Sequence, residues 1–252
     1  MHVSILLLAM NTRLLYLTTL GAAALLGQSC SSDKSDAPAP KPAPQGYVRI
    51  VNNLTASQPV AGEIQLYVGG KTVGPGAAVG KATPYQPVAA GEHFVQIMLP
   101  SASGGGTQWV QFSALPIAES KRYSLFTRTA GSLHHTALVV EEATAVPAPV
   151  AGKAHIRVVN IASQSTPVRI EDRQTSTAFY TEVAWGAVTG YQAVDARTYR
   201  LNVTRAAYPQ APLFVQSAAL EPGKTYSLVL RGSTEASAAP TEQLAFDVIE
   251  DQ

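Results

Sequence analysis

Cysteine is almost absent from this sequence: Cys30 is the only one among 252 residues. A disulfide within the chain is therefore excluded, and each folded part must be held together by its apolar core. Charge is also scarce, since charged residues make up 14% of the chain and 18 basic residues accompany 17 acidic ones. No strong field of one sign attracts a polyanion, which argues against a nucleic-acid partner.

Long apolar runs are confined to the start of the chain. Residues 14–27 are mostly apolar, follow Arg13 and end just before Cys30. This run has the length of a signal-peptide core and is shorter than the ~20 apolar residues of a relaxed membrane span. Small residues, Gly27 and Ser29, flank the expected cleavage region. We therefore expect residues 1–29 to be a bacterial lipoprotein signal peptide, with Cys30 lipidated as the first mature residue.

Two further expectations concern this segment. Cleavage near Ser29 without lipidation would give an ordinary secreted protein, but an exposed free thiol is a liability in an exported chain, which favours lipidation. Translation is expected to start at Met10 rather than Met1, because residues 11–13 (NTR) after Met10 make a compact basic start and residues 1–9 hold no Lys or Arg. The predicted partner is a membrane, through the lipid anchor. The predicted location is the outer membrane, on its periplasmic face or at the cell surface.

Proline-rich segments divide the rest of the chain. Residues 30–46 include an alternation of Ala and Pro and predict an extended, semi-rigid tether. Residues 144–153 have a similar composition and predict a linker. The two predicted domains are residues 47–143 and residues 154–252. Few contacts are expected to cross the linker, so each half is expected to fold alone.

The two halves are repeats of one another. Residues 48–52 (VRIVN) return as residues 156–160 (IRVVN), and residues 123–125 (YSL) return as residues 226–228. A third matching stretch joins residues 79–88 to residues 185–194. A repeat of roughly 105 residues has the size of a domain, so it indicates tandem duplication rather than a solenoid.

Each repeat has the pattern of β-strands. Ile64, Leu66 and Val68 alternate with polar or aromatic neighbours, as in a half-buried strand. Glycine-containing turns separate such runs, and no helix-length stretch has a 3.6-residue period. The prediction is an all-β chain of two tandem immunoglobulin-like antiparallel β-sandwich domains, each with roughly seven strands. A small β-barrel is the alternative.

The motif order resembles a known family. VRIVN, then a glycine followed by Thr-x-Tyr-x-x-Val, then Tyr-Ser-Leu is similar to the domain-of-unknown-function family numbered 4397, over residues 47–142 and 154–250. The resemblance implies an exported or surface protein, often a lipoprotein of a Gram-negative bacterium, and it carries no catalytic residues. The second copy departs from the pattern at residues 195–197 (DAR), where the first has residues 89–91 (AAG).

Motifs of catalysis and metal binding are missing. The sequence has no nucleophile elbow, zinc-protease helix, P-loop or EF-hand loop. The adjacent His134 and His135 lack a third ligand nearby. Arg49 and Arg157 are expected on the polar faces of their strands, paired with acids. We therefore expect no catalytic residue, no metal, no cofactor and no enzymatic activity.

Two aromatic residues are candidate ligand contacts. Trp109 and Tyr208 each lie among small and polar residues between two predicted strands. Exposed aromatics on such loops bind sugars or protein surfaces, although Trp109 at the start of a strand would instead enter the core. The predicted function is a non-catalytic binding or structural role in the cell envelope, with a glycan or protein ligand. The alternative is a cell-wall or glycan-acting hydrolase or its accessory module.

Overall fold

The computed structural model describes residues 43–54, 63–100, 107–130, 135–142, 146–163, 166–233 and 243–251. The predicted signal peptide, Cys30 and nearly all of the tether lie outside these residues. Strands make up the regular structure, and the described part of the chain contains no helix, so it also contains no helix able to span a membrane.

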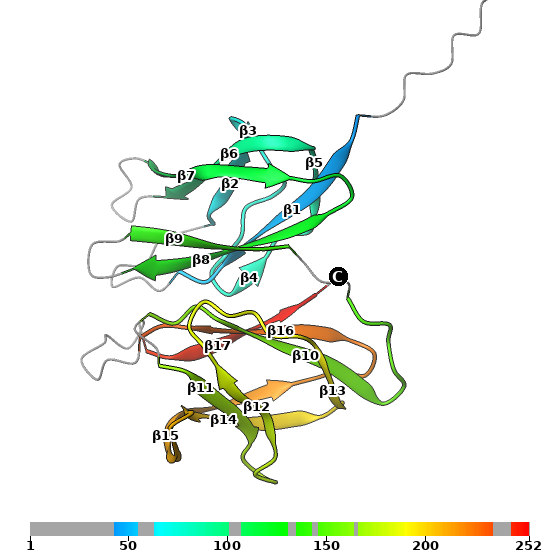
Figure 1. Cartoon of the computed structure of the whole chain (residues 1–252), viewed down its shortest axis with the longest axis vertical. Helices are drawn as coiled ribbons and strands as arrows, with labels where there is room; N and C mark the ends of the chain where they lie inside the picture. The colour runs from blue at the N-terminus through cyan, green and yellow to red at the C-terminus, as the bar shows by residue number, and fades with distance from the viewer. Residues whose placement is uncertain are drawn as a thin grey trace, which may run out of the picture. The chain divides into compact units, whose positions relative to one another are not determined.

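The first half is built from two sheets (Figure 1). One sheet contains β1 (Gln45–Asn52), β4 (Lys81–Ala82), β5 (Gln86–Ala89), β8 (Arg122–Ala130) and β9 (His135–Glu142). The other contains β2 (Gln65–Val68), β3 (Lys71–Thr72), β6 (Gly91–Pro100) and β7 (Thr107–Ile117). Their inward side chains form one apolar core, which includes Ile50, Leu66, Ile97 and Leu125.

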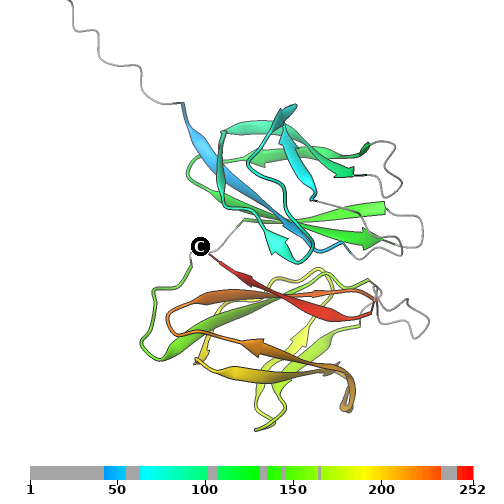
Figure 2. The same cartoon turned by 180° about the vertical axis from the view of Figure 1, so that it is seen from behind.

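The second half repeats this arrangement. Its first sheet contains β10 (Lys153–Asn160), β13 (Gln192–Asp195), β16 (Thr225–Arg231) and β17 (Ala245–Glu250), with β17 beside β16 in Figure 2. Its second sheet contains β11 (Val168–Asp172), β12 (Ala178–Val183), β14 (Thr198–Arg205) and β15 (Tyr208–Ala219). The strand orders β13-β10-β16-β17 and β12-β11-β14-β15 match those of the first half. The all-β sandwich prediction is confirmed.

The sandwiches were predicted to be purely antiparallel, and in this respect the prediction is wrong. β1 pairs with β8 in parallel, and β10 pairs with β16 in parallel, while the other strand pairs are antiparallel. Parallel neighbours need a long crossover connection. Here the chain passes through the opposite sheet between β1 and β8. Alternation within one strand carries no information about the direction of its neighbour, so the sequence pattern did not predict this pairing.

The central strands are buried on both faces. In β1, Val48 and Ile50 point into the core of the first half, and the intervening Arg49 and Val51 are also buried. Val51 belongs to a further apolar cluster, whose buried members are Val51, Phe126, Val159, Ile161, Val229 and Ile249. The cluster joins side chains from both halves, which belong to one compact unit. The two halves therefore meet through this cluster as well as through the linker, and the expectation that each half folds alone stays a prediction.

Candidate functional site

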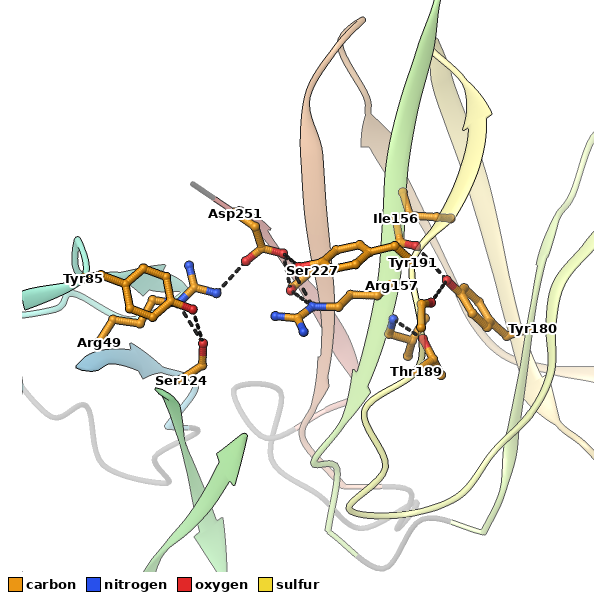
Figure 3. A network of polar contacts seen from close by, with 12 residues as sticks. Arg49, Tyr85, Ser124, Ile156, Arg157, Tyr180, Thr189, Tyr191, Ser227 and Asp251 are labelled. Atoms are coloured by element: carbon orange, nitrogen blue, oxygen red, sulfur yellow. Dashed lines mark hydrogen bonds and ion pairs between the residues drawn. The ribbon is translucent and has the colours of Figure 1, made fainter. Parts of the chain in front are cut away.

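Each half carries the same arginine–tyrosine–serine group on its central sheet (Figure 3). Arg49 Nε donates a 2.9 Å hydrogen bond to Ser124 Oγ, and its guanidinium lies 4.7 Å from the centre of the Tyr85 ring. The Tyr85 hydroxyl is 2.8 Å from Ser124 Oγ. In the second half the corresponding residues are Arg157, Ser227 and Tyr191. Arg157 Nε donates a 2.7 Å hydrogen bond to Ser227 Oγ, and the Arg157 guanidinium lies 4.7 Å from the centre of the Tyr191 ring.

One carboxylate, that of Asp251, connects the two groups (Figure 3). Its Oδ1 accepts a 2.5 Å hydrogen bond from Arg49 Nη2, and its Oδ2 lies 3.5 Å from Arg157 Nε. Ser227 and Tyr191 also donate to Oδ2, at 2.6 and 2.9 Å. The Asp251 side chain is 2% exposed. The arginines are thus paired with an acid as expected, but they are buried instead of lying on an exposed polar face.

A second polar contact joins the halves nearby. Asn53 Nδ2 donates a 2.8 Å hydrogen bond to Asp247 Oδ2, and Arg231 Nε donates to the same carboxylate. Gly80 has a φ of +72°, and a Cβ there would lie 3.2 Å from Asp247 Oδ1. The left-handed backbone and this close approach both favour glycine. Most of these polar groups are therefore bonded to one another, and Asn53 Oδ1 is the buried atom of this contact that has no hydrogen-bond partner among the described residues.

The repeated tyrosines have structural partners. The hydroxyls of Tyr123 and Tyr226 accept hydrogen bonds from the backbone N–H groups of Ala118 and Glu221, whereas those of Tyr85 and Tyr191 contact the side chains of Ser124 and Asp251. Tyr180 is a further case that the sequence did not indicate. Its hydroxyl lies 2.7 Å from the carbonyl oxygen of Ile156 (Figure 3), and burial raises its pKa to about 12.

A group of six uncharged side chains lies on the outward side of β2, β6 and β7, next to the exposed Glu92 near the start of β6. We call it the aromatic face, and its members are Gln65, Tyr67, Phe94, Gln96, Met98 and Trp109. Strand alternation produces it, because Leu66, Val95 and Ile97 between these positions point into the core. Phe94 is 62% exposed and Trp109 is 48% exposed. The rings of Tyr67 and Trp109 meet edge to face, with centroids 4.8 Å apart.

Trp109 therefore fits neither of the two sequence interpretations completely. It lies within β7, opposite Met98, and so it belongs to a strand rather than a loop. It points outward rather than into the core. Tyr208 is 64% exposed at the start of β15, immediately after a two-residue turn that follows β14. These two candidates lie on sheets of different halves and do not form one site.

The corresponding surface of the second half has different chemistry. Matching the strand registers places Arg169, Glu171, Arg200, Asn202 and Thr204 where the first half has Gln65, Tyr67, Phe94, Gln96 and Met98. Arg169 Nε donates a 2.9 Å hydrogen bond to Glu171 Oε2, and Asn202 Nδ2 donates a 2.9 Å hydrogen bond to Glu171 Oε1. Burial raises the pKa of Glu171, but these two hydrogen bonds outweigh it and leave the pKa below its ordinary value. The same sheet is thus built without outward aromatics.

A groove of about 370 Å³ lies between the edge strands β12 and β13 of the second half. The Arg197 guanidinium stacks 3.8 Å from the centre of the Tyr199 ring, and its Nη2 donates a 2.7 Å hydrogen bond to Asp172. Phe179 meets Tyr199 edge to face at 5.3 Å. At the rim, Lys153 Nζ lies 2.6 Å from Asp195 Oδ1.

Both carboxyl groups of the groove are held ionised. Burial raises the pKa of Asp172, but hydrogen bonds from Arg197, the Gln174 N–H and Thr175 outweigh it, so the pKa lies below its ordinary value. The hydrogen bond from Lys153 lowers the pKa of Asp195, and the same bond raises the pKa of Lys153. The groove therefore offers fixed hydrogen-bond donors and acceptors, not a proton donor of intermediate pKa.

Metal-binding geometry is not found in the described ranges, which contain no group of three or more His, Cys, Asp or Glu side chains suited to a metal ion. His134 and the side chain of His135 lie outside what the structure describes. The predictions that concern Cys30 also lie outside it.

Comparison with known proteins gives a family match and similarity to distantly related solved structures. Residues 46–171 match the sequence model of the family described as "Domain of unknown function (DUF4397)". Among solved structures, the chain is similar to CBMbc, a family CBM26 module from Eubacterium rectale Amy13K in complex with maltoheptaose. The identity is 10%, the match covers 79% of this chain and 99% of that chain, and the TM-score is 0.24. No curated protein matches the chain.

Proposed function

This chain belongs to the family of the domain of unknown function DUF4397, and we propose from its own geometry that it is a non-catalytic glycan-binding protein of the cell envelope. In this proposal a lipid on Cys30 holds the protein at the outer membrane, and the proline-rich tether separates the sandwiches from the lipid surface. The aromatic face then binds a neutral polysaccharide.

The observation that carries the proposal is the composition of the aromatic face. Exposed rings such as Phe94 and Trp109 present flat apolar surfaces, which stack on the apolar face of a sugar ring. The amide of Gln96 lies beside these rings and offers hydrogen bonds to hydroxyl groups, and Gln65, whose Nε2 donates a 3.0 Å hydrogen bond to the Gly74 carbonyl, keeps its amide oxygen as an acceptor. No member of the face is charged, which fits a neutral ligand. The second half forms the same sheet with ion pairs, so the fold itself does not require these aromatics.

The hydrolase alternative is less well supported. A glycoside hydrolase needs one carboxylic acid that stays protonated near neutral pH and donates its proton to the leaving group. The two carboxyl groups of the groove, Asp172 and Asp195, both have a pKa below the ordinary value. Asp172 is also bound by Arg197 and Thr175. These features favour binding over catalysis.

Removal of the exposed rings tests the proposed binding face. The double substitution Phe94→Ala/Trp109→Ala is expected to weaken binding to an insoluble or oligomeric neutral glycan at least about tenfold, which corresponds to ~1.4 kcal/mol. Affinity gels with neutral glucans, xylans and mannans, followed by calorimetry with the matching oligosaccharide, measure the effect. Tyr208→Ala, which removes an equally exposed aromatic from the other half, is the matched control and should leave binding unchanged.

Folding stability has to be measured in parallel. Because both rings are about half exposed or more, the free energy of unfolding should change little. A loss of about 3 kcal/mol or more from Trp109→Ala alone would identify a structural residue and remove the basis of the proposal. Wild-type protein that binds none of these glycans would contradict it directly.

The proposed anchor has its own test. Cys30→Ala should move the protein from the membrane fraction of cells into the soluble fraction, because no other cysteine can accept a lipid. Stable attachment through lipidation requires two acyl signals rather than one, which a lipid-modified N-terminal cysteine supplies. Fractionation followed by immunoblotting measures the shift. Unchanged membrane association of Cys30→Ala would show that another feature holds the protein there.

A further inference from the structure

We infer that the groove between β12 and β13 is a second carbohydrate subsite, which takes one neutral pyranose unit. The inference deepens the proposed function and rests on it for the class of ligand. The groove belongs to a different half from the aromatic face and is built from different residues, so the two sites can fail separately.

The groove is specific to the second repeat. Its rim and one wall come from Asp195 and Arg197, at the point where the repeats diverge. The first repeat has Ala89 and Gly91 in the corresponding positions, so it has neither the carboxylate nor the guanidinium. The second repeat thus carries two opposite charges beside aromatic side chains at this place. The first repeat forms the same fold without them, so the fold does not require them.

The charges of the groove favour a neutral polar ligand. Its cations, Lys153 and Arg197, are each already paired with an anion, Asp195 and Asp172 respectively. A charged ligand would have to displace one partner of an ion pair. A sugar hydroxyl need not do so, because it donates to a carboxylate and accepts from the neighbouring ammonium or guanidinium group at the same time.

The shape and the apolar part of the groove agree with a single ring. Its volume of about 370 Å³ is near the lower end of the ~300–1,000 Å³ typical of small-molecule sites. Phe179 is only partly buried and lines the groove beside the stacked Arg197 and Tyr199. The planar guanidinium is held in place by Tyr199, by Asp172 and by a 3.1 Å hydrogen bond from its Nη1 to Gln174 Oε1, so the N–H donors that these contacts leave are preorganised for a ligand.

Removal of the rim pair is the decisive test. Lys153 and Asp195 are exposed, so Lys153→Ala/Asp195→Ala deletes a donor and an acceptor with little effect on the melting temperature. The variant should bind the oligosaccharide identified for the aromatic face at least about fivefold more weakly than wild type. Lys224→Ala/Glu250→Ala removes a similarly exposed ion pair outside the groove and is the matched control, with no expected change.

Backbone amide shifts separate the possible outcomes. Titration of the wild-type protein with neutral gluco-, xylo- and manno-oligosaccharides should shift the amide signals of Ala193 and Asp195 as well as those of β6. Shifts confined to β6 and β7 would overturn the second subsite while the proposed function stands. Shifts confined to the groove would support the subsite and contradict the aromatic face. No shift at either place would overturn both.

Discussion

Replacement of Asp251 with alanine is expected to lower the free energy of unfolding by about 3–5 kcal/mol, the usual cost of removing one partner from a buried ion pair. The reason is that two guanidinium groups, those of Arg49 and Arg157, would remain buried without this carboxylate. Ser227 and Tyr191 would lose an acceptor as well. Urea denaturation followed by tyrosine and tryptophan fluorescence measures the change.

Two further variants define what this result means. Asp195→Ala removes an exposed carboxylate and should leave the denaturation midpoint almost unchanged. Asp251→Asn keeps an acceptor oxygen but not the charge, so its midpoint should lie between those of wild type and Asp251→Ala. If Asp251→Ala unfolds at the same urea concentration as wild type, the carboxylate does not stabilise the contact between the halves.

Replacement of Phe126 with alanine is expected to cost about 3–5 kcal/mol, as for other large buried aromatics. Phe126 is fully buried in the cluster that contains side chains from both halves. Its loss should also change the form of unfolding. Wild type should unfold in one transition because the halves share this cluster, whereas Phe126→Ala should begin to separate into two transitions.

Differential scanning calorimetry tests this expectation. Phe94→Ala is the control, since Phe94 is an exposed phenylalanine of the same half, and one transition at nearly the wild-type temperature is expected for it. Two separate transitions already present in wild type would mean that the halves unfold independently. The original sequence-based expectation, that each half folds alone, would then be correct.

Strand pattern and duplication were both readable from the sequence. Alternation at Ile64, Leu66 and Val68 correctly predicted a strand with one buried face. The VRIVN motif is different, because Val48 to Asn52 are all buried, each face against a different core. A strand with apolar residues at both odd and even positions is expected to be buried on both faces. The sequence does not show which part of the protein covers the second face.

The aromatic face and the groove were harder to predict from the sequence, because they depend on how neighbouring strands are aligned with one another. Trp109 was a candidate by its residue type, but its neighbours Tyr67 and Phe94 come from other strands, and only the pairing of β2, β6 and β7 brings them together. The groove had a local signal, the departure of residues 195–197 from the repeat pattern. Asp251 also had a local signal. Tyr123 pairs with Glu142 in the first repeat and Tyr226 pairs with Glu250 in the second, so these two glutamates are equivalent. The residue after the glutamate is Ala143 in the first repeat and Asp251 in the second, which is another departure from the repeat pattern.

The position of Asp251 has a consequence for the order of folding. It lies 202 residues beyond Arg49, the residue of the first half from which it accepts a hydrogen bond and for which it is the counterion. While the chain is being made, β1 and β8 can pair and the first core can form, but Arg49 has no such counterion until β17 and Asp251 have been made. Contacts of such large sequence separation form late and slow the overall process. The first half is thus made early and completed last, and a chain truncated before β17 would expose a charged, incompletely covered sheet to chaperones and proteases.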